Sequence, residues 1–150
     1  VFAEHGFQPY DLCPLRLEIG GAVVVAIAVP GRIWFRPGKM SRVLEAKRVA
    51  RASGLACLLV PEGAVRQQPR LANCEAIARS AGTPVDATDR MSVLHHLIEG
   101  AGATLWECAH LVRNPHPVDA ILSMISAKEL WIDVDGPMLP HSMVEVGGGR

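Results

Sequence analysis

Apolar and polar side chains alternate over residues 15–19, whereas residues 22–30 form an unbroken apolar run. Alternation is typical of a strand with one polar face, and a short continuous apolar run is typical of a strand that is buried on both faces. Gly20 and Gly21 lie between the two runs and favour a two-residue hairpin turn, because both turn positions need a positive φ. The pattern therefore predicts a β-hairpin.

Residues 41–54 predict a helix, which follows a loop rich in proline and glycine. Ser41 is a suitable N-cap and Gly54 a suitable stop. The apolar positions recur at helical spacing and are Val43, Leu44, Ala46, Val49 and Ala50. Residues 55–60 form a further short apolar run. The order strand, strand, helix, strand predicts a small α/β layer.

A domain boundary is predicted near the middle of the chain. Pro69 suits the first position of a linker helix, and Gly82 and Pro84 then interrupt the helical pattern. We therefore expect a first domain over residues 1–82, which includes the linker helix, and a second domain over residues 83–150.

The second half predicts three short helices. The first carries an apolar face formed by Met91, Leu94, Leu97 and Ile98. Thr104 and Glu107 have the spacing of a capping box at the start of the second helix. Pro117 begins the third helix, whose apolar positions at i, i+3, i+4 and i+7 are Val118, Ile121, Leu122 and Ile125.

Two strands follow these helices, over residues 130–134 and about 142–146, with an Asp-Gly-Pro turn between them. Three helices and a β-ribbon form the winged-helix arrangement, in which the second and third helices are the helix-turn-helix pair. A third helix that contacts the major groove presents Arg, Lys, Asn or Gln. This one instead offers Asp119, Ser123, Ser126 and Lys128. The composition favours a packing or protein-docking module.

The net charge of the chain is zero, but its two halves differ. Residues 1–78 carry ten Lys and Arg against six Asp and Glu, whereas residues 79–150 carry five against nine. Seven cations lie between Arg32 and Arg51, with Glu45 as the opposing acid. Such a cluster is suited to phosphates, and the alternative is an ordinary solvated loop and helix face.

Several classes of function lack a signal in the sequence. No apolar run is long enough to span a bilayer, and no glycine-rich nucleotide-binding motif occurs. The four cysteines form no CxxC pair, and Cys108, His110 and His116 lack the i+3 or i+4 spacing of metal ligands on a helix. We expect a reduced, cytoplasmic protein that uses no membrane, nucleotide or metal cofactor.

The segment "LACLLVPEGAVRQQPRLANCEAIARS", residues 55–80, resembles the region that closes the nuclease domain of TnsA-type endonuclease subunits of heteromeric transposases. "FQPYDL", residues 7–12, is similar to the segment that precedes the nuclease strands in that family. The resemblance spans most of the chain. It implies an α/β (α+β) fold, with a small restriction-endonuclease-like layer followed by a winged-helix domain.

The resemblance also implies where a metal site would lie. In the family, an Asp on one strand and an acid two residues before a Lys on the next strand hold Mg²⁺ and the attacking water. Here Leu15 stands at the position of the Asp, Ala26 at that of the acid and Ala28 at that of the Lys. These side chains offer no oxygen ligand, which leaves no catalytic residue at the expected positions.

Three functions remain open from the sequence. The first is a non-catalytic TnsA-like subunit, which acts as a DNA-adjacent adaptor and contacts a transposase or ATPase subunit. The second is an active Mg²⁺-dependent endonuclease with migrated ligands, for which Asp11 and Glu18 with Lys39 or Lys47 are the candidates. The third is a winged-helix DNA-binding regulator. For the first function the predicted DNA-binding residues are Arg32, Arg36, Lys39, Arg42, Lys47, Arg48 and Arg51.

Overall fold

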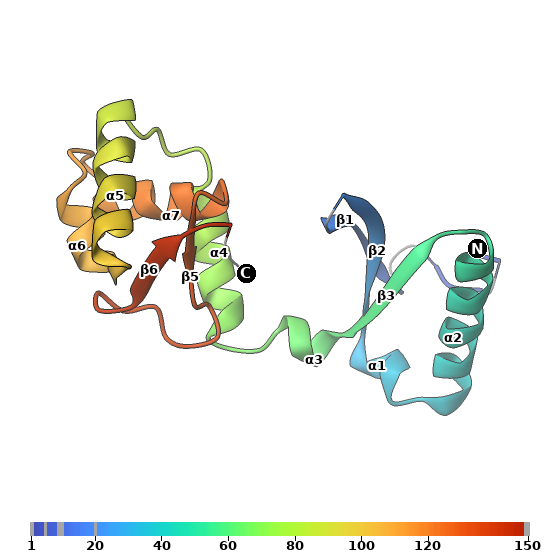
Figure 1. Ribbon diagram of the computed structural model, residues 1–150. Coiled ribbons are helices and arrows are strands. Elements are labelled where there is room, and N and C mark those ends of the chain that lie inside the picture. Colours follow the sequence, from blue (N-terminus) through green and yellow to red (C-terminus); the bar gives the residue numbers. More distant parts are fainter. Residues whose placement is uncertain (1, 5, 9–10, 20, 149–150) are drawn as a thin grey trace. The chain divides into compact units, whose positions relative to one another are not determined.

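The computed structural model describes residues 2–4, 6–8, 11–19 and 21–148 (Figure 1). The chain divides into two compact units, residues 1–67 and residues 68–150, and the fold is of the mixed α/β type. No helix among the described residues combines the length and the apolar character that crossing a membrane requires. Each unit is described separately below.

The first unit contains a three-stranded sheet and the helices that follow its strands. Its elements are β1 (Cys13–Ile19), β2 (Ala22–Val29), α1 (Gly31–Trp34), α2 (Pro37–Ala52), β3 (Ala56–Pro61) and α3 (Glu62–Val65). The strand order is β1-β2-β3, with β1 antiparallel and β3 parallel to β2. A parallel pair needs a crossover connection, which α1 and α2 provide here. The predicted pairing of the hairpin strands, the helix and the third strand are confirmed, whereas Gly20 of the predicted turn lies outside the described residues.

One face of this sheet packs against α2 (Figure 1). Ile27 and Val29 point to this face from β2, and they form a buried cluster with Val43 of α2 and Ile33 of α1. Ala46 of α2 is also fully buried. Small side chains on the inner face of a helix permit a close approach to the sheet.

The opposite face of the sheet is not covered by any element of the described part of this unit. Leu15 on β1 is 54% exposed and Leu58 on β3 is 47% exposed, although both are apolar. The prediction that β2 is buried on both faces is therefore wrong for its first half, where Val23 is exposed. Only the second half of β2, which α1 and α2 cover, is deeply buried.

Helix α2 begins earlier than the sequence predicted. Pro37 occupies the first turn, and Arg36 precedes it with an extended backbone. Ser41 lies inside the helix, where its hydroxyl donates a hydrogen bond to the carbonyl of Pro37 at 2.9 Å. The fixed φ of proline favours a helix start and outweighs the cap signal of a serine four residues later.

The second unit contains four helices and a small antiparallel sheet within its described residues. Its elements are α4 (Arg70–Ser80), α5 (Ala87–Gly100), β4 (Ala103–Thr104), α6 (Leu105–His110), α7 (Pro117–Ser126), β5 (Leu130–Ile132) and β6 (Met143–Val146), with α4 as the first of them. The sheet order is β4-β6-β5. The three later helices and both ribbon strands agree with the sequence, whereas the two-residue strand β4 was not predicted.

Helix α4 belongs to the second unit, so the chain divides between Gln67 and Gln68 and not near residue 82. The amide nitrogen of Asn73, a buried side chain, donates hydrogen bonds to the carbonyls of Val134 at 3.0 Å and Gly136 at 2.8 Å. Arg70 forms an ion pair with Asp135 at 2.8 Å. These contacts fix the loop between β5 and β6 to α4.

The buried face of α5 differs from the predicted one. Val93 and Leu97 lie in the core, whereas Met91 and Ile98 point to solvent. Asp89, one turn before Val93, is also buried, and it accepts a hydrogen bond from the backbone of Arg113 at 2.9 Å. The need to satisfy this contact sets the rotation of the helix.

The predicted capping box at the start of α6 is confirmed. The backbone nitrogen of Glu107 donates to the hydroxyl of Thr104 at 3.2 Å, and the Glu107 carboxylate accepts from the Thr104 backbone at 2.8 Å. These bonds satisfy two of the otherwise unpaired amides at the helix start, and they hold the pKa of Glu107 below its ordinary value.

We predict that Asn73→Ala destabilises the second unit by about 1–3 kcal/mol, because two carbonyls lose their donor in a buried site. Asn73→Asp is expected to cost more, since a carboxylate would face the same two carbonyls. Urea unfolding followed by circular dichroism measures both values. Asn114→Ala, which removes a partly exposed amide that donates one hydrogen bond to the carbonyl of Pro84, is the comparison and is expected to cost less than Asn73→Ala. Equal stability of Asn73→Ala and wild type would contradict the role given to Asn73.

Candidate nucleic-acid interface

The seven predicted DNA-binding cations all lie on α1, on α2 or at the residue that connects them. Three of them already have partners within the first unit. Arg32 forms an ion pair with Asp11 at 3.3 Å. Arg48 forms a bidentate ion pair with the carboxylate of Glu45, with hydrogen bonds of 2.6 and 2.9 Å. The guanidinium of Arg42 lies 5.4 Å from the centre of the Phe7 ring. Their charge is partly satisfied inside the unit.

The other four cations have no acidic partner within the described part of the chain. These are Arg36, Lys39, Lys47 and Arg51. Lys47 is half-buried and the other three are exposed. Lys47 and Arg51 are four residues apart and therefore lie on the same side of the helix. From Lys39 to Arg51 the helix advances about 18 Å at about 1.5 Å per residue.

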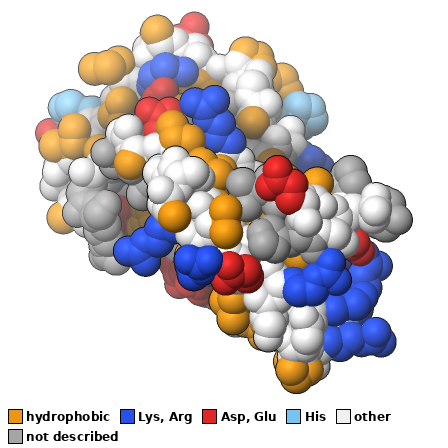
Figure 2. Space-filling view, turned by 90° about the vertical axis from the view of Figure 1, so that its right-hand side faces the viewer, with side chains coloured by type: hydrophobic (Ala, Val, Ile, Leu, Met, Phe, Trp, Pro, Cys, Tyr) orange, Lys and Arg blue, Asp and Glu red, His pale blue; other side chains and the backbone are white. Residues whose placement is uncertain are grey.

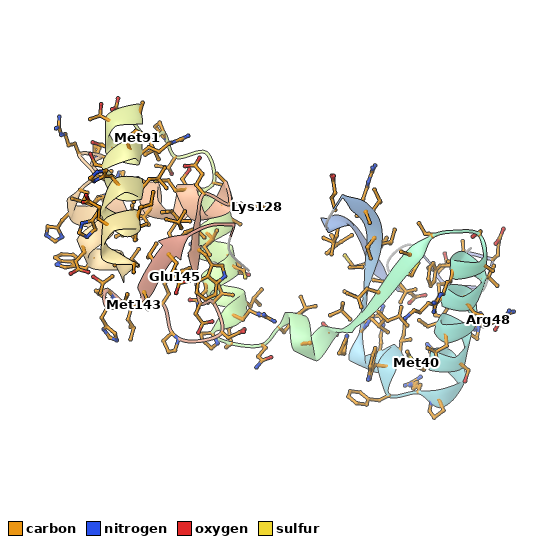
Figure 3. All side chains as sticks on the ribbon, viewed as in Figure 1. Met40, Arg48, Met91, Lys128, Met143 and Glu145 are labelled. Atoms are coloured by element: carbon orange, nitrogen blue, oxygen red, sulfur yellow. The ribbon has the colours of Figure 1, made fainter. Side chains whose placement is uncertain are left out.

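Figures 2 and 3 both show Lys and Arg side chains at the surface of the protein. Lys and Arg side chains gather at the lower right of the face in Figure 2. In Figure 3 the labelled Arg48 projects from α2 away from the sheet. A concentration of cations on one helix, with few acids between them, gives a local positive potential.

Phe35, between α1 and α2, is a residue that the sequence analysis did not single out. Its ring is 83% exposed, and it directly precedes Arg36. A large exposed aromatic ring beside a cation is a possible stacking surface for a nucleic-acid base. The sequence could have indicated that Phe35 is exposed, because it lies in a Pro- and Gly-rich loop and not on the apolar face of a helix or strand.

The three positions that the family resemblance assigns to a metal site are brought together by the sheet. Leu15 of β1 pairs directly with Ala26 of β2, and Ala26 pairs with Leu58 of β3 on its other side. Ala28 follows two residues later and so points to the same face. This face carries apolar side chains where a metal would need oxygen ligands.

No group of three or more His, Cys, Asp or Glu side chains suited to a metal occurs among the described residues. The alternative ligands Asp11 and Glu18 are also kept apart. Asp11 precedes β1 at the end where Cys13 pairs with Ala28, whereas Glu18 pairs with Val23 at the other end. The strand rise of about 3.3 Å per residue places them on the order of 20 Å apart. They cannot share one ion.

Glu62 organises the loops at the carboxyl ends of the two parallel strands. One carboxylate oxygen accepts a hydrogen bond from the backbone of Gly31 at 3.2 Å, and the other contacts Arg66 at 2.7 Å. The Gly31 amide, followed by Arg66, holds the pKa of Glu62 below its ordinary value. Glu62 therefore connects the start of α1 to the end of β3. The sequence analysis did not identify this residue, although its i, i+4 spacing to Arg66 is typical of an ion pair on a helix.

Helix α7, the fourth helix of the second unit, corresponds to the predicted third helix of the winged-helix arrangement, and it is largely covered. Ser80 at the end of α4 donates a hydrogen bond to Asp119 at 3.0 Å, and Ser123 donates to the carbonyl of Thr83 at 3.0 Å. Two of the polar residues considered for groove contacts are thus used inside the unit. That α7 does not contact bases stays a prediction.

The cysteine and histidine residues of α6 have structural contacts. Cys108 is buried, and burial raises the pKa of its thiol to about 11, which disfavours a nucleophilic thiolate at neutral pH. The ring of His110 packs edge-on against Trp106 with centroids 4.3 Å apart.

Trp106 and Trp131 are both exposed large aromatic residues, and Trp106 is 58% exposed. Trp106 borders an open hollow of about 320 Å³ with Thr104, Pro140 and His141. Helical periodicity identifies an apolar position but does not tell whether another element covers it.

Comparison of the chain with protein-family models, with curated proteins and with solved structures finds no match.

We predict that Glu62→Gln reduces the acid sensitivity of the first unit. A carboxylate whose folded pKa is depressed stabilises the fold above its unfolded pKa, about 4.3, and this stability is lost as the pH falls through the folded value. Thermal unfolding should therefore show a difference between wild type and Glu62→Gln at neutral pH that shrinks in acid. Glu75→Gln, an exposed change on α4, is the control. A difference that is independent of pH would contradict this role.

Proposed function

We propose that this protein is a non-catalytic, TnsA-like subunit that binds DNA through α1 and α2 and acts as an adaptor in a transposition complex. The observation that carries the proposal is the set of four cations without an acidic partner in the described chain, on α2 and the residue before it. Phosphates are the ligands that such a set accommodates without rearrangement of existing ion pairs.

The order of elements supports this proposal. A hairpin, a crossover helix and a parallel third strand are the connections of a restriction-endonuclease-like layer in reduced form. Helix, short strand, two helices and a two-stranded ribbon, with sheet order β4-β6-β5, are the elements of a winged helix. This combination is the one that the TnsA resemblance implies.

The absence of cleavage chemistry follows from the side chains of the central strand. Leu15 and Ala26 are neighbours across the hairpin, and neither they nor Ala28 can bind a divalent cation or polarise water. Asp11, the nearest acid to this end of β1, is engaged by Arg32 at 3.3 Å. The protein therefore contributes binding and not hydrolysis.

The second unit supplies the protein-facing surface in this proposal. It carries exposed apolar side chains around the Trp106 hollow, namely Trp106, Leu139, Pro140 and Met143. Exposed tryptophans are frequent anchors of protein interfaces. A transposase or ATPase subunit is the partner class that the resemblance implies for this surface.

We predict that the triple variant Arg36→Gln, Lys47→Gln, Arg51→Gln flattens the salt dependence of DNA binding by roughly three units of slope. Each phosphate contact releases about 0.9 counterions, so three lost contacts change the slope of log K against log salt accordingly. Fluorescence anisotropy with a labelled duplex, measured over a series of salt concentrations, gives this slope.

The matched control replaces three exposed cations of the second unit, Arg79, Arg113 and Lys128, with Gln and should leave the slope near that of wild type. Equal changes in both triple variants would reduce the effect to net charge and overturn the assignment to α2. Strong preference of the wild type for one DNA sequence would instead support the regulator.

We further predict that the protein does not cleave supercoiled plasmid or transposon-end duplexes with Mg²⁺ or Mn²⁺ at millimolar concentration. Asp11→Asn serves as the discriminating variant, because Asp11 is one of the two acids considered as migrated ligands and lies just before β1. Cleavage by wild type that is abolished in Asp11→Asn would establish the endonuclease with migrated ligands. Cleavage that persists in both proteins would indicate a contaminating nuclease.

A further inference from the structure

Strand β1 lies at an edge of the sheet in the first unit. One side of the strand pairs with β2 over residues 13–19, and no backbone hydrogen bond within the described chain reaches its other side. An edge strand presents unpaired N–H and C=O groups to solvent, and these groups can pair with a further strand.

Two opposite charges lie on this edge strand. Arg16 and Glu18 are both exposed, and neither has an ion-pair partner within the described residues. They are two residues apart and therefore point to the same face of the sheet. Leu17, between them, points to the opposite face and is partly exposed.

We propose that two copies of this chain associate through antiparallel pairing of β1 with β1, on a twofold axis at Leu17. In this register Arg16 of each copy lies directly opposite Glu18 of the other, and the two leucines lie opposite each other. Directly opposed residues of an antiparallel pair point to the same face, so two cross-strand ion pairs form on one face. The sheets of the two copies become one.

The charges select this register over its neighbours. A twofold axis at Arg16 would place two arginines opposite each other, and an axis at Glu18 would do the same with two glutamates. An axis between two residues would join the apolar face of one copy to the polar face of the other. Pro14, which has no N–H to donate, lies outside the five-residue ladder of residues 15–19.

The proposal is independent of DNA binding, because it uses none of the cations of α1 and α2. The other edge strand, β3, carries no charged side chain and so offers no comparable register signal. The paired strands would also bring the exposed Leu15 and Leu17 of both copies onto one continuous apolar face.

Sedimentation equilibrium of the chain of residues 1–150, from micromolar to near-millimolar concentration, tests the dimer. Wild type is expected to dimerise, and Arg16→Glu or Glu18→Arg alone should weaken the dimer by about tenfold or more, since each turns two attractive pairs into repulsive ones. The double variant Arg16→Glu/Glu18→Arg should restore it. A mixture of the two single variants should form a heterodimer that neither forms alone.

That mixture distinguishes a lost register from a lost fold, because a misfolded variant cannot regain its partner on mixing. A wild type that stays monomeric throughout the concentration range would overturn the proposal. Dimerisation of both single variants at wild-type strength would overturn the register.

An engineered disulfide provides a second test. In a chain with Cys13, Cys57 and Cys74 replaced by Ser, Leu17→Cys should cross-link two copies on oxidation, because opposed Cα atoms of antiparallel strands lie about 4.5–5.5 Å apart. Leu58→Cys, an exposed position on β3, is the control. Equal cross-linking at both positions would point to random collision and contradict the β1 interface.

Discussion

The first unit depends on the position of β2 as the central strand of its sheet. The strand carries no polar side chain, so it gains most from lying between two strands, with α1 and α2 over its second half. Its backbone groups are satisfied by β1 on one side and by β3 on the other. The parallel partner on one side requires a crossover, and this requirement places α2, with its cations, on the surface of the unit.

The same constraint bears on chemistry. Carboxylates held close together repel each other and are expensive to bury without a metal, whereas Leu15 and Ala26 pack across the hairpin at no such cost. Ala26 is buried between two large leucines from the neighbouring strands. An acid placed there would lose hydration, whereas the present alanine is buried without that cost.

The second unit is organised by α4, which contacts both the loop of the β-ribbon and α7. Asn73 donates hydrogen bonds to the carbonyls of the loop, and Ser80 donates a hydrogen bond to Asp119. Because α4 lies against α7, the polar side chains of Asp119 and Ser123 on α7 are used in contacts within the unit.

Sequence signals within a few residues predicted most helices and strands. They failed where a contact with a residue far along the chain determines which side of an element is buried. The Thr104–Glu107 cap, the Gly-rich hairpin and the periodicity of α7 lie within a few residues and were predicted correctly. The rotation of α5, by contrast, depends on the burial of Asp89, whose partner is Arg113.

Contacts between residues far apart in the sequence also determine to which unit α4 belongs and which cations of the candidate interface have partners. The membership of α4 rests on carbonyls more than sixty residues away. The cluster of seven cations on α1, on α2 and at Arg36 between them is evident from the sequence. The sequence could not tell which of these cations have partners in the folded unit and which do not. That separation requires Asp11 and Phe7, which reach Arg32 and Arg42 from the amino-terminal segment.

This separation matters physically, because a cation that already has a partner must exchange it to bind phosphate. The exchange replaces one favourable contact by another, so the net gain is smaller than for a cation that faces solvent. Arg48 holds both oxygens of Glu45, whereas Arg51, one turn later, holds none within the described chain. The number of α2 cations that face solvent without an acidic partner is therefore set by the local ion pairs of the helix and not by its total charge.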